Sequence, residues 1–185
     1  MYLISSMDLQ LYSKSKNPHG SFPEKFELQF YQAFHTLKKL GCDYLYFLGI
    51  EDQISYRFCT HDYWMDIYNT EKLILNDPLR RVSESSNFIL LPWTQITHLH
   101  GDEKKTMNAR SSNGLFNGLT ISRQHNNKKY IFALATELKD HDLARYLVLE
   151  NINTVEQVFS YYIKLFNQYL ALQCEPNCKR SIIFN

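Results

Sequence analysis

The sequence predicts an α+β fold in which an antiparallel sheet is sandwiched between helices, an α/β/α arrangement. Strand-like segments occur as two hairpin pairs, and helical segments precede and follow these pairs without regular strand-helix alternation. The chain has 185 residues, enough for one domain with a single substantial core. These observations exclude a parallel doubly wound sheet and favour one antiparallel sheet with helices on its faces.

The N-terminal part predicts a flexible arm over residues 1–20 and then a helix. Residues 5–20 are rich in Ser, Lys, Asn, Pro and Gly. Ser21 and Glu24 have the spacing of a capping box, and apolar side chains then recur on one helical face as far as Leu40. Gly41 is a natural stop for this helix.

Two hairpins are predicted from short strand-like segments. Residues 42–50 and 54–60 flank a turn at Glu51-Asp52-Gln53. Residues 115–124 and 128–136 flank a turn around Asn126-Asn127. Four antiparallel strands are expected from these segments.

The region between the two hairpins predicts short helices and one more extended segment. A helix is expected from Asp62, and another starts at Asp77-Pro78, with proline in its first turn. Residues 88–93 form a short apolar strand, and residues 102–112 form a polar helix.

A long C-terminal helix is predicted to open at Asn153. Apolar residues recur along it at helical spacing as far as Leu170. We therefore expect the folded domain to span residues 21–173 and residues 174–185 to form a tail.

The central region also carries a sparse pattern of aromatic, acidic and glycine residues. Tyr68 follows Trp64 by four residues, Asp77 follows Tyr68 by nine, and Trp93 follows Asp77 by sixteen. Residues 114–121, Gly-Leu-Phe-Asn-Gly-Leu-Thr-Ile, complete the pattern. In order and spacing it resembles the autoinducer-binding domain of the LuxR family of quorum-sensing regulators, over roughly residues 22–173.

The resemblance implies a PAS-like ligand-binding domain that binds an acyl-homoserine lactone or a similar amphipathic signal. It implies that Trp64 donates its indole N–H to the lactone carbonyl and that Asp77 accepts the amide N–H. It also implies that Trp93 packs on the lactone ring and Tyr68 lies beside the acyl group. Gly118 is included among the binding residues, although a glycine here also permits close packing.

Three positions depart from the family pattern. Thr60 stands where relatives place a tyrosine, Ala133 stands where they place a hydroxyl, and Ser122 replaces a proline. The first two would contact the acyl carbonyl of the ligand, so one donor is shortened and the other is lost. The ligand therefore differs from a standard lactone, or it binds more weakly, or packed side chains fill the pocket.

Composition excludes several other functions. Lys and Arg number 20 against 19 for Asp and Glu, so no basic stripe is present and direct nucleic-acid binding by this chain is not expected. The four cysteines do not form a disulfide framework, and the absence of a secretory signal predicts a cytoplasmic location without membrane contact. We expect no cofactor and no metal. The chain ends at Asn185 without the DNA-binding domain that such regulators carry.

Two alternatives to a ligand receptor are open: an enzyme and an interaction module. His98, His100 and Asp102, together with His61-Asp62, are the clusters with metal or acid-base character, but no third metal ligand can be assigned and no catalytic signature is present. An interaction module is the second alternative. Such a module would have no ligand and would pair with full-length relatives, as expected of a family whose members dimerise through this domain.

Overall fold

Six strands form a single sheet in the order β1-β3-β2-β6-β5-β4. The computed structural model describes residues 20–178 of the chain, apart from residues 53, 98 and 99. The five longer strands are antiparallel as predicted, while the two-residue β1 runs parallel to β3. The strands are β1 (Gly20–Ser21), β2 (Tyr44–Glu51), β3 (Ile54–Cys59), β4 (Phe88–Pro92), β5 (Phe116–His125) and β6 (Lys128–Thr136).

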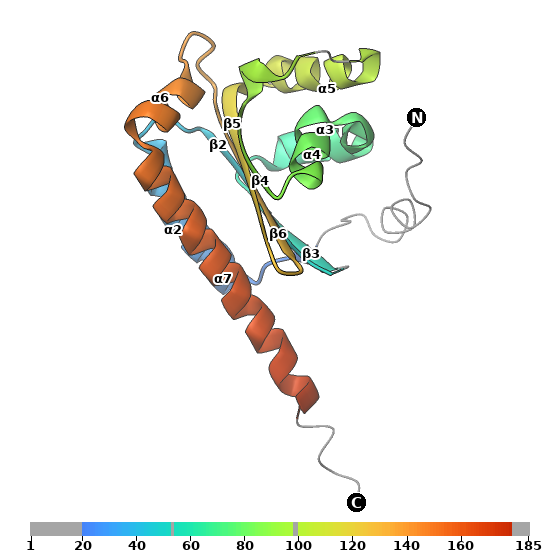
Figure 1. Ribbon diagram of the computed structural model, residues 1–185, viewed down its shortest axis with the longest axis vertical. Helices are drawn as coiled ribbons and strands as arrows, with labels where there is room; N and C mark the ends of the chain where they lie inside the picture. The colour runs from blue at the N-terminus through green and yellow to red at the C-terminus, as the bar shows by residue number, and fades with distance from the viewer. Residues whose placement is uncertain (1–19, 53, 98–99, 179–185) are drawn as a thin grey trace, which may run out of the picture.

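Helices cover both faces of this sheet, which confirms the predicted α/β/α sandwich (Figure 1). One face is covered by α2 (Glu24–Lys38), α6 (Leu143–Glu150) and the long α7 (Ile152–Cys178). The other carries α3 (Asp62–Thr70), α4 (Pro78–Ser85) and α5 (Gly101–Ser112), with the short turns η1 (Leu73–Asn76) and η2 (Trp93–Gln95). Within the described ranges, no helix is both long and apolar enough to cross a membrane.

The two faces of the sheet hold two separate clusters of buried side chains. Because side chains alternate along a strand, Phe47 of β2 and its partner Phe132 of β6 face α2 and α7, whereas the neighbouring pair Tyr46 and Ala133 faces α3–α5. Phe132 stacks on Phe159 at 4.9 Å. The first cluster is therefore a closed aromatic core, and the second is where the sequence placed its candidate site.

Three details of the predicted elements need correction. Ser21 lies in β1, and the residue that caps α2 is Pro23, without a side-chain hydrogen bond. Helix α6 was not predicted, although Asp142 caps it by accepting a hydrogen bond from the backbone N–H of Arg145. Helix α7 continues to Cys178, so the predicted boundary at residue 173 falls inside a helix. The predicted arm lies outside the described residues except for Gly20.

Candidate functional site

A small cavity lies between the sheet and the layer of α3, α4 and α5. Its volume is about 50 Å³. Tyr46 of β2 pairs with Ala133 of β6, which in turn pairs with Thr120 of β5, so the three side chains form one row on the cavity floor. Leu48 and Ile131 form the next apolar row on the same face. The cavity therefore has a mostly apolar floor.

The walls come from segments far apart in the sequence. The structure brings Trp64, Tyr68, Asp77 and Trp93 together around this cavity with Ala133, five of the seven predicted site residues. The remaining wall residues are Tyr44, Met65, Ile74, Leu79, Arg80, Ser83 and Arg110.

The spacing of Trp64 and Tyr68 explains their shared orientation. They lie one turn apart on α3, both are buried, and their ring centroids are 5.6 Å apart. Asp62 begins this helix as the sequence predicted. The two rings thus form one aromatic wall.

Asp77 is buried at the start of α4 and accepts three hydrogen bonds. Its Oδ1 accepts from the backbone N–H of Leu79 at 3.0 Å, which caps the helix. Its Oδ2 accepts from the Tyr68 hydroxyl at 2.6 Å and from Nη2 of Arg110 at 2.5 Å. Burial and the neighbouring Asp77 charge raise the pKa of Tyr68 well above its usual value, so this hydroxyl remains a donor.

Arg110 reaches this cavity from α5 and lines it, although the sequence did not indicate it as a site residue. Its side chain is 8% exposed and forms a buried ion pair with Asp77. Its guanidinium carbon lies 5.7, 5.8 and 5.4 Å from the ring centroids of Trp64, Tyr68 and Trp93. Burial alone would lower the pKa of Arg110, but Asp77 and Tyr68 raise it above its ordinary value. A permanent cation therefore occupies an aromatic cage at the polar end of the cavity.

Trp93 is fixed by a polar contact and by a close backbone approach. Its indole N–H donates to Oγ1 of Thr120 at 2.9 Å. A Cβ at Gly118 would lie 2.4 Å from Cε2 of Trp93 and 2.5 Å from the backbone oxygen of Leu134. Gly118 does not line the cavity, and its contribution is to let the indole lie against the strand.

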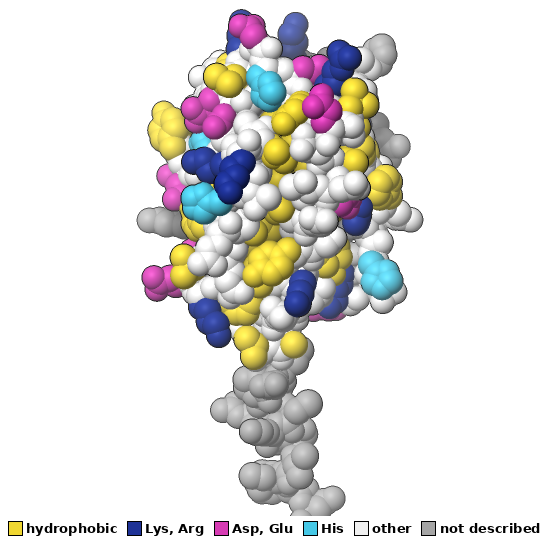
Figure 2. Space-filling view, turned by 90° about the vertical axis from the view of Figure 1, so that its left-hand side faces the viewer, with side chains coloured by type: hydrophobic (Ala, Val, Ile, Leu, Met, Phe, Trp, Pro, Cys, Tyr) yellow, Lys and Arg dark blue, Asp and Glu magenta, His cyan; other side chains and the backbone are white. Residues whose placement is uncertain are grey.

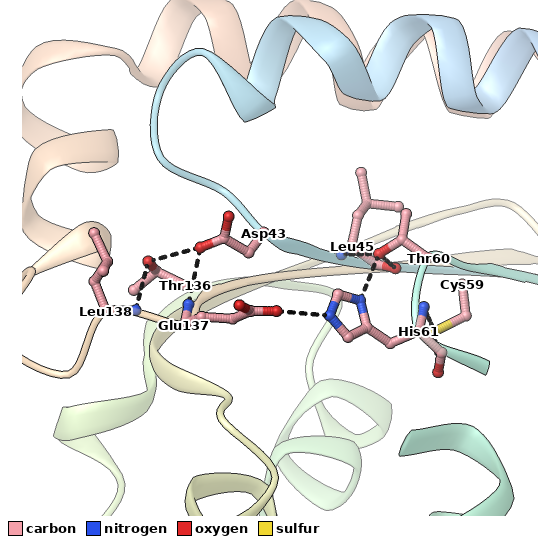
Figure 3. Close-up of polar contacts among 8 residues, drawn as sticks. All are labelled: Asp43, Leu45, Cys59, Thr60, His61, Thr136, Glu137 and Leu138. Atoms are coloured by element: carbon pink, nitrogen blue, oxygen red, sulfur yellow. Dashed lines mark hydrogen bonds and ion pairs between the residues drawn. The ribbon is translucent and has the colours of Figure 1, made fainter. Parts of the chain in front are cut away.

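Thr60 has a structural position outside the cavity. Its Oγ1 accepts a hydrogen bond from the backbone N–H of Leu45 at 2.9 Å and lies 3.2 Å from Nδ1 of His61 (Figure 3). Nε2 of the same histidine is 3.3 Å from Oε1 of Glu137. Thr60 thus joins the end of β3 to β2 and is not among the residues that line the cavity.

Two further polar residues, Thr120 and Ser83, line the cavity, and the sequence could have indicated the first as a cavity residue more readily than the second. Thr120 lies in the quoted glycine-containing segment, and the two-residue alternation of a strand could have placed it on the floor. Ser83 is completely buried, lines the cavity, and has no hydrogen-bond partner for its hydroxyl among the described residues. No periodicity in the sequence of the polar helix α5 indicated that Arg110 would face inward.

The residues of the enzyme alternative do not assemble a site in the described part of the chain. His98 lies outside the described residues, and the backbone N–H of His100 donates to Oε2 of Glu103 at the start of α5. No group of three or more His, Cys, Asp or Glu side chains in the described ranges could hold a metal ion.

Comparison with known proteins identifies the class to which this architecture belongs. Residues 29–160 match the sequence family described as the autoinducer binding domain, and this match covers most of the chain. The chain therefore belongs to the autoinducer-binding domain family, whose members sense small signal molecules. No protein with a curated description matches the chain significantly by sequence.

Solved structures share the fold at low sequence identity. Escherichia coli SdiA superposes with a TM-score of 0.58 and 11% identity over 88% of this chain and 66% of that chain. SdiA in complex with octanoyl-rac-glycerol superposes with a TM-score of 0.57 and 12% sequence identity, over 87% of this chain and 65% of that chain. CepR2 from Burkholderia cenocepacia is described as an N-acylhomoserine lactone dependent LuxR family transcription factor. It superposes with a TM-score of 0.51 and 12% sequence identity, over 80% of this chain and 96% of that chain. The chain thus spans about two thirds of the SdiA chain.

Proposed function

We propose that this chain is the sensing domain of a LuxR-type regulator and binds a small amphipathic acyl signal in the cavity under α3, α4 and α5. The observation that supports this most strongly is the cavity itself, which combines a buried polar cluster at Asp77 with an apolar floor. A ligand with a polar head and an acyl chain matches that division. Acyl-homoserine lactones and acylglycerols both belong to this chemical class.

Binding requires the cavity to widen. A volume of about 50 Å³ holds a few water molecules but not an acyl lactone. The roof consists of short helices, whereas the floor is a fully paired sheet. We therefore expect a ligand to move α3–α5 and to couple binding to the stability of this layer. The related SdiA has been crystallised with octanoyl-rac-glycerol, which supports acyl compounds as candidates.

A thermal-shift titration with an acyl-length series tests this proposal. Ligand at a hundredfold its dissociation constant stabilises the folded state by about 2.7 kcal/mol, so some acyl lengths should raise the melting temperature. Ala133→Leu should suppress the shift, because the added methyl groups fill the floor of the cavity. Ala33→Leu is the control, since Ala33 is partly buried and packs against the core on the other face of the sheet, away from the cavity. Unchanged melting across the whole series would contradict the proposal.

Homodimerisation is a second part of the proposed function. The outer face of the α2 and α7 layer carries a broken band of apolar side chains between charged ones (Figure 2). The exposed large apolar residues of these two helices are Leu28, Tyr31, Tyr161 and Leu172. Sedimentation equilibrium with and without ligand tests this: a ligand-dependent dimer fits a sensor, and a dimer indifferent to every ligand fits the interaction module instead. Paired with a full-length relative instead, the chain would act on transcription without contacting nucleic acid itself, in the cytoplasm.

A further inference from the structure

We propose that the acyl chain of the ligand carries an oxygen, as a hydroxyl or a keto group, far from the head group, and that Ser83 binds this oxygen. The inference rests on the proposed sensing function and adds a second polar contact at the end of the cavity away from Asp77. The residue that carries it is a completely buried serine that lines the cavity.

The Ser83 hydroxyl has no hydrogen-bond partner in the part of the chain that the structure describes. Serine within a helix can bond back to a backbone carbonyl of the preceding turn. Ser85 does so on the same helix, where its hydroxyl donates to the backbone oxygen of Val82 at 3.1 Å. A buried hydroxyl without a partner is unfavourable, and a ligand oxygen beside Ser83 would remove that cost.

Ser83 and Asp77 lie at different ends of the cavity along α4. Leu79 and Ser83 are four residues apart, so both belong to the helix face that lines the cavity. Asp77 caps this helix six residues before Ser83, and a rise of about 1.5 Å per residue separates the two by about 9 Å. The oxygen bound by Ser83 therefore lies well along the acyl chain and not beside the head group.

The sheet beneath α4 gives the same order. Thr120 of β5 accepts a hydrogen bond from Trp93 at 2.9 Å, and Ser122 lies two residues further along the same face of this strand. Oγ of Ser122 donates to the backbone oxygen of Ser83 at 3.2 Å. This bond holds the backbone of Ser83 over the strand and leaves its own hydroxyl for the cavity.

A series of hydroxylated lactones tests the inference on the full chain by calorimetry. The probes are the N-acyl homoserine lactones from octanoyl to dodecanoyl, each as the plain chain and with one hydroxyl on each chain carbon in turn. A hydroxyl should weaken binding by about tenfold at most positions, because it is buried there without a partner. At one position several carbons beyond the acyl carbonyl it should instead tighten binding by about fivefold, because it meets Ser83.

Ser83→Ala removes the proposed partner and little else. In this variant the favoured hydroxylated probe should bind about tenfold weaker than the plain chain, whose own affinity should not fall. Ser85→Ala is the matched control on the same helix: Ser85 is exposed and should keep the wild-type preference. Without ligand, Ser83→Ala should not lower the midpoint of urea unfolding, because no hydrogen bond is lost.

Each outcome has one meaning. A favoured position far along the chain, lost in Ser83→Ala and kept in Ser85→Ala, supports the inference. Tightest binding of the plain chains, a preference that survives in Ser83→Ala, or a lower unfolding midpoint of that variant overturns the inference while the sensing function stands. Binding of none of the probes overturns the inference and the proposed function together.

Discussion

The buried pair between Asp77 and Arg110 should dominate the stability of the α3–α5 layer. Asp77→Ala removes a single carboxylate that serves three donors, on Arg110, Tyr68 and Leu79. Its loss leaves a buried cation unpaired, a buried hydroxyl without an acceptor and a helix without its cap. We expect this to be the most destabilising single change to a polar residue of the site.

The magnitude follows from these three losses. Breaking a buried ion pair by removing one partner costs about 3–5 kcal/mol, an unsatisfied buried hydroxyl about 1–3 kcal/mol, and a lost N-cap about 1 kcal/mol. Because the three donors share one acceptor and relax together, we expect a total of roughly 5 kcal/mol rather than the full sum. Arg110→Met should cost about 3 kcal/mol, since Asp77 keeps two of its donors.

A double-mutant cycle by urea unfolding measures the pair itself. Asp77→Ala combined with Arg110→Met removes both charges, so it should be less destabilising than the two single changes added together, by at least about 2 kcal/mol. Arg81→Met breaks a pair in which Arg81 is 60% exposed and Glu103 only 10%, and it should cost less than Arg110→Met, whose pair with Asp77 is buried on both sides. If the two changes at Asp77 and Arg110 are additive within about 0.5 kcal/mol, the ion pair does not hold this layer and the reasoning is refuted.

Three further outcomes are expected. Gly118→Ala should destabilise the fold by about 1–3 kcal/mol in urea unfolding, because its Cβ would overlap Trp93, whereas Gly101→Ala, which has nothing within 4 Å, should change little. Burial and the nearby Asp43 raise the pKa of the Cys42 thiol to about 12. The contribution of this thiol to the free energy of unfolding is therefore complete below its unfolded-state pKa near 8.5, and it falls by about 1.4 kcal/mol per pH unit above that value. Unfolding of Cys42→Ala should therefore depend less on pH between about 9 and 11, and parallel curves would contradict this. Ala133→Ser should tighten binding of an acyl lactone by about 1 kcal/mol in calorimetry, and unchanged affinity would show that no acyl carbonyl lies over the cavity floor.

The fold could be predicted largely because its signals are local. Alternation and turn residues gave both hairpins, and Asp77-Pro78 marks the start of α4 where the structure has it. The missed helix α6 has only eight residues and a short apolar pattern, so its Asp142 cap was the sole strong local signal. At Ser21 the capping pattern was outweighed, because this residue pairs with β3 as part of β1.

The site could be predicted only where the spacing of residues along a single helix or strand fixes the direction in which their side chains point. Trp64 and Tyr68 share a helix face and Ala133 lies on the floor, positions that helix and strand geometry determine. Thr60 does not line the cavity, and its hydroxyl instead accepts a hydrogen bond from the backbone N–H of Leu45, a contact that no spacing in the sequence reveals. Arg110 could not be predicted because its partner Asp77 lies 33 residues away, and a long-range ion pair has no signature in the local pattern.

The asymmetry of the two layers gives the site a way to respond. On the α2 and α7 side, rings pack directly against the sheet, and the Tyr162 hydroxyl donates to the backbone oxygen of Phe30 at 2.6 Å. On the α3–α5 side, short helices are tied together at the Asp77–Arg110 pair, with a small void beneath it. Local opening is least costly where fewer apolar contacts must be broken. We therefore expect a ligand that enters under the second layer to change the contacts of Arg110, and of α5 with it, while the aromatic core keeps the sheet in place.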